Sequence, residues 1–150
     1  MANVKEAPRR EELRPRRKSL GIDDLTGLDD RKAISAVKTG LDSRLLKELA
    51  ERLDLRLDEL ALPLQMTGRT LHRRIEEGRL LLDESERLFG LIRIFALAKQ
   101  TLSSEAKAVR WLKSPLPVLG GRTPLECADT QIGLRGLEDI LIRIGDVVYS

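Results

Sequence analysis

Residues that bind metals or form disulfides are almost missing from this sequence. Its 150 residues include one Cys and one His, whereas zinc fingers, iron–sulfur centres and disulfide frameworks each need several such side chains. These three classes are therefore excluded, and we expect neither a metal ion nor a cofactor. Aromatic residues are also few, at 3% of the chain, so leucine and isoleucine must fill the hydrophobic core.

Long apolar runs are missing as well. Unbroken apolar stretches reach only a few residues, as at 80–82, and a membrane-spanning helix needs about 20. The basic residues near the start of the sequence are not followed by the apolar stretch and small-residue cleavage site of a signal peptide. We therefore expect a cytoplasmic protein with no membrane partner.

The sequence offers no recognisable catalytic set. It has no paired carboxylates spaced for acid–base catalysis, no Ser, His and Asp combination, and no second ligand beside its one His. Cys127 lies among apolar neighbours, which is typical of a buried, inert thiol. The Gly-Gly-Arg triplet at 120–122 lacks the preceding strand and the Gly-Lys-Ser/Thr ending of a phosphate-binding loop, and indicates a turn. We expect no enzymatic activity and no catalytic residue.

Charge is abundant and unevenly distributed. The chain has 27 Lys and Arg against 24 Asp and Glu. Residues 61–113 contain ten basic and six acidic side chains, whereas residues 114–150 contain three basic and five acidic ones. This asymmetry suggests two surfaces for two kinds of partner. Residues 1–19 are basic, with two prolines and few apolar side chains. They are predicted to be a disordered tail, either a solvated leader or an arm that contacts nucleic-acid backbone.

Apolar residues recur at helical spacing along most of the chain. Repeats of three and four residues, together with capping residues, predict helices over 31–38, 42–53, 57–62, 67–77, 83–102, 105–112, from 123, and over 130–148. The Asp-Glu-Ser-Glu run at 83–86 is interpreted as a capping box that opens the longest helix. The last helix carries an apolar stripe: Leu137, Ile140, Leu141, Ile144 and Val148. No run alternates apolar and polar residues as a strand does, so the predicted fold class is all-α.

Residues 44–77 have the spacing of a helix-turn-helix. Two short predicted helices and a tight connection precede a third helix, in which Leu71 and Ile75 lie four apart and face inward. Such a motif presents the start of its third helix to base edges in the major groove. Arginine can bond bidentately to guanine, and a helix N-terminus suits phosphate. We therefore predict a DNA-binding set on outward positions: Thr67, Arg69, Thr70, His72, Arg73 and Arg74. The alternative is that this charged run is only the solvated face of a buried helix.

Two apolar residues, Val147 and Val148, precede Tyr149 and Ser150. A phenol ring beside a carboxylate suits insertion into a partner's pocket, because the ring buries area while the oxygens make directed hydrogen bonds. The alternative, which physical reasoning favours equally, is that Tyr149 folds back on its own domain.

Two blocks of the sequence resemble the Xre/MbcA/ParS family of antitoxins, which are partners of RES-domain toxins. The first contains Gly-Arg-Thr-Leu-His-Arg-Arg at 68–74 and Glu-Ser at 84–85, and is similar to the Xre-like DNA-binding half of the family. The second contains Ala-Lys-Ala-Val-Arg-Trp-Leu at 106–112, Leu-Gly-Gly-Arg-Thr-Pro-Leu at 119–125 and Val-Tyr-Ser at 148–150, and is similar to the toxin-binding domain. We expect three parts: the disordered tail at 1–19, an Xre-like helix-turn-helix region at 20–102, and a toxin-binding domain at 103–150.

The resemblance implies an antitoxin of a type II toxin–antitoxin system. Such a protein binds an NAD-consuming RES-domain toxin, which is an NAD hydrolase or an ADP-ribosyltransferase, and blocks its active site through the C-terminal domain. It also represses its own promoter, and we expect a homodimer. Two alternatives stay open: a plain repressor whose residues 115–150 only dimerise, and a pure inhibitor whose helix-turn-helix no longer binds DNA. The resemblance implies these toxin-binding residues: Trp111, Leu119, Gly120, Arg122, Thr123, Pro124, Arg135, Val148, Tyr149 and Ser150.

Overall fold

The computed structural model describes the backbone of residues 20–149 and the side chains of residues 20–148. The predicted basic tail lies outside these residues, as does Ser150. Along the described chain the helical segments are α1 (Ile22–Thr26), α2 (Asp30–Thr39), α3 (Arg44–Arg52), the 3-10 helix η1 (Leu57–Leu60), α4 (Gly68–Glu77), α5 (Leu82–Leu102), α6 (Glu105–Leu112), the 3-10 helix η2 (Pro117–Leu119), α7 (Pro124–Cys127) and α8 (Gln131–Tyr149).

Residues 20–149 contain no strand, and only an isolated bridge pairs Asp42 with Arg79. The all-α prediction is therefore confirmed. Among the helices described, none combines the length and the apolar character that crossing a bilayer would require.

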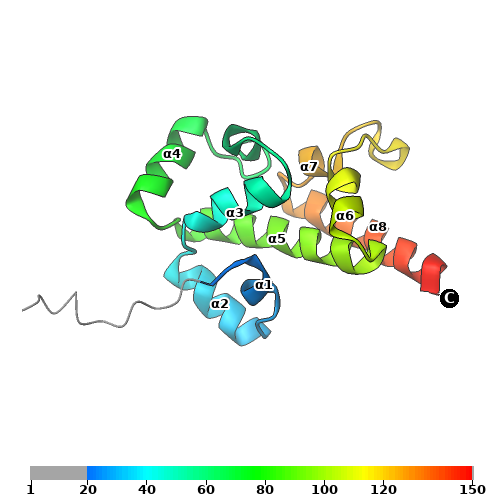
Figure 1. Ribbon diagram of the computed structural model, residues 1–150, viewed down its shortest axis with the longest axis horizontal. Coiled ribbons are helices and arrows are strands. Elements are labelled where there is room, and N and C mark those ends of the chain that lie inside the picture. The colour runs from blue at the N-terminus through cyan, green and yellow to red at the C-terminus, as the bar shows by residue number, and fades with distance from the viewer. Residues whose placement is uncertain (1–19, 150) are drawn as a thin grey trace, which may run out of the picture.

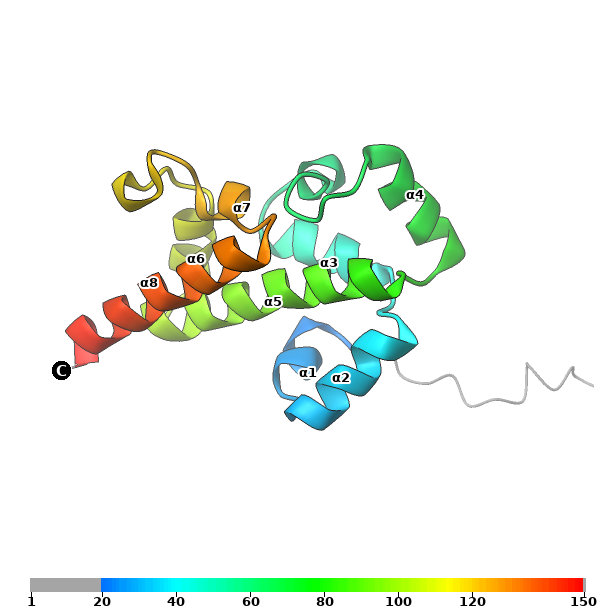
Figure 2. The same ribbon diagram turned by 180° about the vertical axis from the view of Figure 1, so that it is seen from behind.

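The longest helix, α5, is the axis of the fold. Helix α8 packs along it, and α6, α1 and α2 also pack against it. Figures 1 and 2 show from opposite sides that α1 and α2 lie on one side of α5, while α3, α4, α6 and α7 lie on the other. Helix α4 sits at one end of the molecule, and the end of α8 projects at the opposite end (Figure 1).

One hydrophobic core joins the helices, and leucine and isoleucine supply most of it, as the low aromatic content predicts. Phe95 is fully buried on α5 and belongs to a core that consists mainly of aliphatic side chains. Large aliphatic residues that are fully buried in the first two thirds of the chain include Ile22, Leu25, Leu46, Leu49, Leu53, Leu60, Leu64, Leu71, Leu88, Leu91 and Ile92. Leu137 and Leu141 extend the same core into α8.

Several predicted helix starts are confirmed in atomic detail. The hydroxyls of Thr67, Ser104 and Thr123 each accept a hydrogen bond from the backbone amide three residues later, at 3.1, 3.2 and 3.2 Å. Thr130 accepts from the Gly133 amide at 2.9 Å in the same way. These side chains satisfy amides that the first helical turn leaves without an intrahelical partner.

The predicted capping box at 83–86 is wrong. Helix α5 begins earlier, at Leu82, and the carboxylate of Glu84 accepts a hydrogen bond from the Leu81 amide at 2.9 Å. Asp83 therefore lies inside the first turn, where it pairs with Arg87 at 3.2 Å. The physical reason is that a glutamate at the third helical position reaches back to the cap amide, whatever residue occupies the cap.

One other helix prediction needs correction. The helix expected over 57–62 is only the 3-10 helix η1 followed by turns, because Pro63 lacks an amide hydrogen and disfavours helical geometry at the residue before it. The apolar stripe of α8 is buried at Leu137 and Leu141, whereas Val148 is 62% exposed on the end of α8 that projects from the molecule (Figure 1).

Candidate functional site

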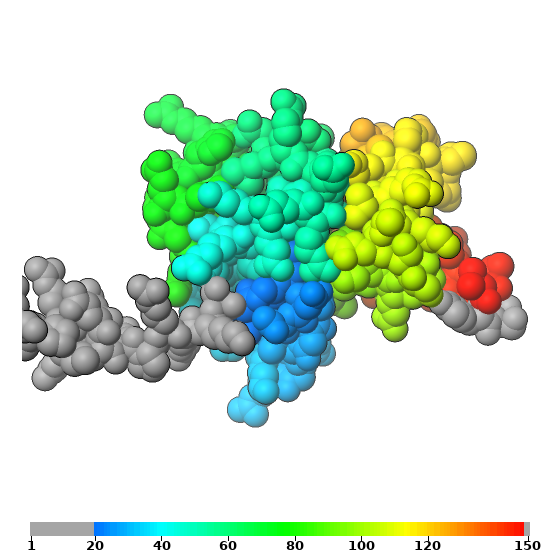
Figure 3. Space-filling model, in the orientation of Figure 1, coloured from blue at the N-terminus to red at the C-terminus, as the bar shows by residue number. Residues whose placement is uncertain are grey.

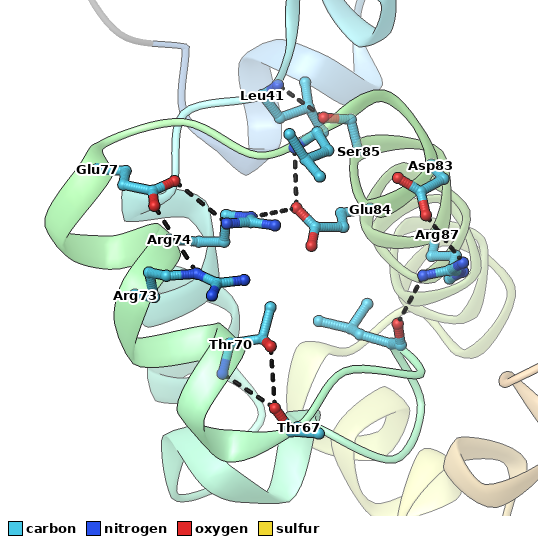
Figure 4. Close-up of polar contacts among 12 residues, drawn as sticks. Leu41, Thr67, Thr70, Arg73, Arg74, Glu77, Asp83, Glu84, Ser85 and Arg87 are labelled. Carbon is cyan, nitrogen blue, oxygen red and sulfur yellow. Dashed lines mark hydrogen bonds and ion pairs between the residues drawn. The ribbon is translucent and has the colours of Figure 1, made fainter.

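Helix α4 begins at a well-formed cap. The Thr67 hydroxyl accepts from the Thr70 amide at 3.1 Å, and the two hydroxyls are hydrogen bonded to each other at 2.9 Å. Both threonine side chains therefore define the start of the helix (Figure 4). The N-terminal end of α4 carries the partial positive charge of the helix dipole, which favours an anion such as a phosphate.

The exposed face of α4 carries three potentially cationic side chains. Arg69, His72 and Arg73 are exposed, at positions that share one side of a helix. His72 lies 3.2 Å from the carboxylate of Asp58, and Arg73 lies 3.8 Å from that of Glu77. The opposite side of the helix carries Leu71, which is fully buried. The predicted inward and outward faces are confirmed at these positions.

Arg74 does not lie where the sequence predicts it. Its side chain is buried, at 7% exposure for the residue, and its Nε donates to Glu84 at 2.6 Å. A second nitrogen donates to Glu77 at 3.2 Å. The exposure prediction is wrong because position 74 follows Leu71 by one helical turn and so shares the face turned toward the start of α5 (Figure 4). Hydrogen bonding to Glu84 raises the pKa of Arg74 above its ordinary value.

The segment between α6 and α7 is a compact, hydrogen-bonded turn. The Leu116 amide donates to the Arg122 carbonyl at 3.0 Å, and the Gly121 amide donates to the Leu116 carbonyl at 3.0 Å. Gly120 and Gly121 both have positive φ, at 67° and 84°, a conformation that glycine adopts without strain. The turn predicted at 120–122 is confirmed.

The predicted toxin-binding residues of this region differ in exposure. Gly120 and Arg122 are exposed, Trp111 and Leu119 are half-buried against the core, and Pro124 is buried. Thr123 caps α7 in a true capping box, since its own amide donates to Glu126 at 3.2 Å.

Helix α8 passes very close to the end of α7. A Cβ placed on Gly133 would overlap the carbonyl oxygen of Cys127, which makes glycine necessary there. The Cys127 side chain is half-buried rather than fully buried as predicted. On α8, Arg135 and Val148 are exposed, while the side chain of Tyr149 and all of Ser150 lie outside the described residues. In residues 20–149 no three His, Cys, Asp or Glu side chains are grouped to hold a metal ion.

Two family models match this chain one after the other. Residues 32–93 match the antitoxin Xre-like helix-turn-helix domain, and residues 97–146 match the antitoxin Xre/MbcA/ParS C-terminal toxin-binding domain. The chain belongs to the Xre/MbcA/ParS antitoxin family. The resemblance seen in the two sequence blocks is thereby confirmed, and the helix-turn-helix assignment with it.

Two curated relatives of this antitoxin family are named Antitoxin Xre. The one from Pseudomonas putida KT2440 is 39% identical over 79 residues, which are 52% of this chain and 50% of that protein. The one from Yersinia enterocolitica is 30% identical over 79 residues, which are 52% of this chain and 53% of that protein. The chain thus spans about half the length of the curated relatives it matches.

The candidate DNA-binding site and the candidate toxin-binding site lie in different family-matched domains, at opposite ends of the molecule. Helix α4, with its basic residues, is at one end, and the turn before α7 and the end of α8 are at the other (Figures 1 and 3). The boundary predicted between residues 102 and 103 stays a prediction.

Sequence reasoning missed the residues that hold α4 in place. Glu84, Ser85 and Arg87, in the first turns of α5, contact α4 or the segments around it (Figure 4). The available signal was a glutamate three residues after a possible helix cap at Leu81, which is the acidic half of a capping box.

Proposed function

We propose that this chain is the antitoxin of a type II toxin–antitoxin system and that it is not an enzyme. Its residues 97–146 bind and block a RES-domain, NAD-consuming toxin, and α4 binds the promoter of its own operon. The observation that carries the proposal is the succession of a helix-turn-helix match and a toxin-binding match in one chain, at opposite ends of the fold. Function in the cytoplasm as a homodimer is part of the same proposal.

Charge and exposure on α4 support DNA binding. Arg69 makes no ion pair with any residue that the structure describes, and Arg73 has only a long contact of 3.8 Å to Glu77. Both guanidinium groups can therefore turn to phosphate or to guanine without breaking a strong contact. Arg74 is left out of the proposed DNA-contacting set, because its side chain is buried on Glu84.

Exposed apolar side chains on the C-terminal half support binding to a protein. Exposed large aliphatic residues supply apolar area that an interface can bury; the helix-turn-helix half has such residues as well, at Leu20, Ile34, Leu62, Leu81 and Leu82. Around the turn before α7 and along α8 the exposed aliphatic residues are Val118, Ile132, Ile142, Val147 and Val148. The proposed toxin-binding surface consists of these side chains with the exposed Gly120, Arg122 and Arg135.

Toxin neutralisation is tested by co-expressing this chain with the protein encoded by the neighbouring gene, which the proposal expects to be a RES-domain toxin. The full chain should restore growth of the host cells, and a chain that lacks residues 147–150 should restore it only weakly. The matched control is Leu62→Ala, which alters an exposed leucine in the helix-turn-helix half and should protect fully. Complete protection by the shortened chain would contradict a blocking role for the end of α8.

DNA binding is tested with a duplex that the full chain selects from a random pool. Arg69→Ala and Arg73→Ala should each reduce the slope of log affinity against log salt by about one unit. Arg110→Ala, which removes an exposed arginine from α6, should leave that slope unchanged. Selection of a duplex without capture of a toxin would favour the plain repressor. Capture of a toxin without any DNA binding would favour the pure inhibitor.

A further inference from the structure

The last turn of α4 is attached to the first turn of α5 through one carboxylate. Glu84 is 5% exposed, and its Oε1 accepts hydrogen bonds from the Leu81 amide at 2.9 Å and from Arg74 Nε at 2.6 Å. The same oxygen therefore caps α5 and holds α4. Figure 4 shows Glu84 and Arg74 pointing toward each other from these two helices.

The segment that leads into α4 is attached to the same helix. Arg87 donates to the Leu64 carbonyl at 3.3 Å, and Asp83 holds the other nitrogen of Arg87 at 3.2 Å. The segment before α4 and the last turn of α4 are thus both hydrogen bonded to the first two turns of α5 (Figure 4).

The start of α5 is itself fixed to the rest of the helix-turn-helix half. The buried Ser85 hydroxyl accepts from the Leu41 amide at 2.9 Å, and the Leu80 amide donates to the Leu41 carbonyl at 2.9 Å. The first turn of α5 therefore has a defined place, and any side chain that ties α4 to it also sets the direction of α4.

A buried ion pair is well suited to set direction and poorly suited to add stability. Removing two charges from water costs about as much as their attraction returns, so an apolar pair of similar volume often gives an equally stable protein. Hydrogen bonds between charged groups are strongly directional, however. The contact between Arg74 and Glu84 thus constrains the angle of α4 in a way that simple burial of Leu71 does not.

We propose that Glu84, acting through Arg74, is a positioning residue that sets the angle at which α4 meets DNA. This inference rests on the proposed DNA binding. Base contacts depend on that angle, because bidentate hydrogen bonds need defined geometry, whereas phosphate contacts by flexible arginines tolerate a tilt. Glu84 therefore determines discrimination between sequences without touching the duplex.

The central test compares Glu84→Gln with the double variant Glu84→Gln and Arg74→Met. The single variant keeps an oxygen that can accept from Leu81 and Arg74. The double variant keeps the hydrogen bond from the Leu81 amide to residue 84 and most of the side-chain volume. It leaves no unpaired buried charge, and it removes the hydrogen bond between positions 74 and 84 that joins α4 to α5. Glu77→Gln is the matched control, since it neutralises the half-exposed carboxylate that pairs with Arg74 and leaves Glu84 in place.

Each full-length variant is measured for affinity to the duplex selected by the unmodified chain and to a random duplex, at one salt concentration. The double variant should lose about tenfold or more for the selected duplex and keep its affinity for the random one, as expected for a misplaced bidentate base contact. Glu84→Gln and Glu77→Gln should discriminate as the unmodified chain does. An unchanged ratio of the two affinities in the double variant, even with a lower unfolding midpoint, overturns the positioning role. An unmodified chain that prefers no duplex overturns the proposed DNA binding instead.

A second measurement tests the geometry without DNA. Spin labels on cysteines introduced at the exposed Glu76 and Gln100, in a Cys127→Ser background, report the separation of α4 and α5. The double variant should give a broader or shifted distance distribution than Glu84→Gln. Identical distributions overturn the proposal, and so does a double variant that does not fold, because the ion pair would then serve stability.

Discussion

Arg52 and Glu105 join the two family-matched halves of the chain. Arg52 Nε, on α3, donates to Glu105 Oε1, on α6, at 2.7 Å. The same guanidinium donates to Asp23 of α1 at 3.0 Å and lies over the ring of Phe95, 5.2 Å from its centre. Lys113 adds a second connection, donating to the carbonyls of Leu53 and Asp54 at 3.1 and 3.0 Å. The helix-turn-helix half and the toxin-binding half are therefore held in a defined relation.

Replacing Arg52 by Met should destabilise the whole chain. The substitution keeps the aliphatic stem but removes both ion pairs, and the Arg52 side chain is only 19% exposed. We expect a loss of about 1–2 kcal/mol in the free energy of unfolding, measured by urea titration. The control is Arg56→Met, where the side chain is 85% exposed and pairs with Glu59, and its cost should stay below about 0.5 kcal/mol. Equal costs for the two variants would contradict a central role for Arg52.

The same cluster makes stability depend on acidic pH. Hydrogen bonds from Arg52 lower the pKa of Asp23 and Glu105 below their ordinary values. These carboxyls bind protons more weakly in the folded chain, so their contribution is complete above the unfolded pKa and is lost as pH falls through the folded pKa. Stability should therefore decline below about pH 4, and Arg52→Met should decline less steeply. Unfolding titrations at several pH values measure both slopes, and parallel slopes would show that Arg52 does not set them.

Gly40 and Gly78 offer a matched pair of backbone substitutions. Both have positive φ, at 96° and 88°, but a Cβ on Gly40 would lie 2.6 Å from the Leu80 carbonyl oxygen, whereas one on Gly78 would meet nothing within 4 Å. Gly78→Ala should cost about 1 kcal/mol, from the backbone conformation alone. Gly40→Ala should cost clearly more, about 2–4 kcal/mol, because strain and overlap add. Thermal and urea unfolding measure which variant loses more free energy of unfolding. Equal losses would mean that the 40–42 segment can move away from Leu80.

Leu71 anchors α4 to the core by burial. It is fully buried, whereas Leu62, a few residues before α4, is 64% exposed. Leu71→Ala should reduce the free energy of unfolding by about 2–5 kcal/mol, and Leu62→Ala should change it by less than about 0.5 kcal/mol. A small effect at Leu71, measured by urea titration, would indicate that α4 is attached mainly through its polar contacts.

Helix positions and caps could be predicted from the sequence because they depend on neighbours along the chain. Thr67, Ser104 and Thr123 each bond an amide three residues away, and an apolar repeat places Leu71 on an inner face wherever the helix packs. The start of α5 was misplaced since two acidic residues, Asp83 and Glu84, compete for the capping role. Only the backbone path shows which carboxylate reaches the Leu81 amide.

Arg73 and Arg74 separate what the sequence by itself determines from what tertiary structure decides. The sequence alone determines that both lie on a helix, that Leu71 faces inward, and that a helix-turn-helix block precedes a block that matches the toxin-binding domain of the family. It does not distinguish the two arginines, which are adjacent and of the same type. The packing of α4 against the first turn of α5 brings Glu84 to one of them, leaving Arg73 exposed and Arg74 buried. The reason is physical: helical periodicity is a short-range property, whereas the burial of a charge depends on a partner that arrives from elsewhere in the fold.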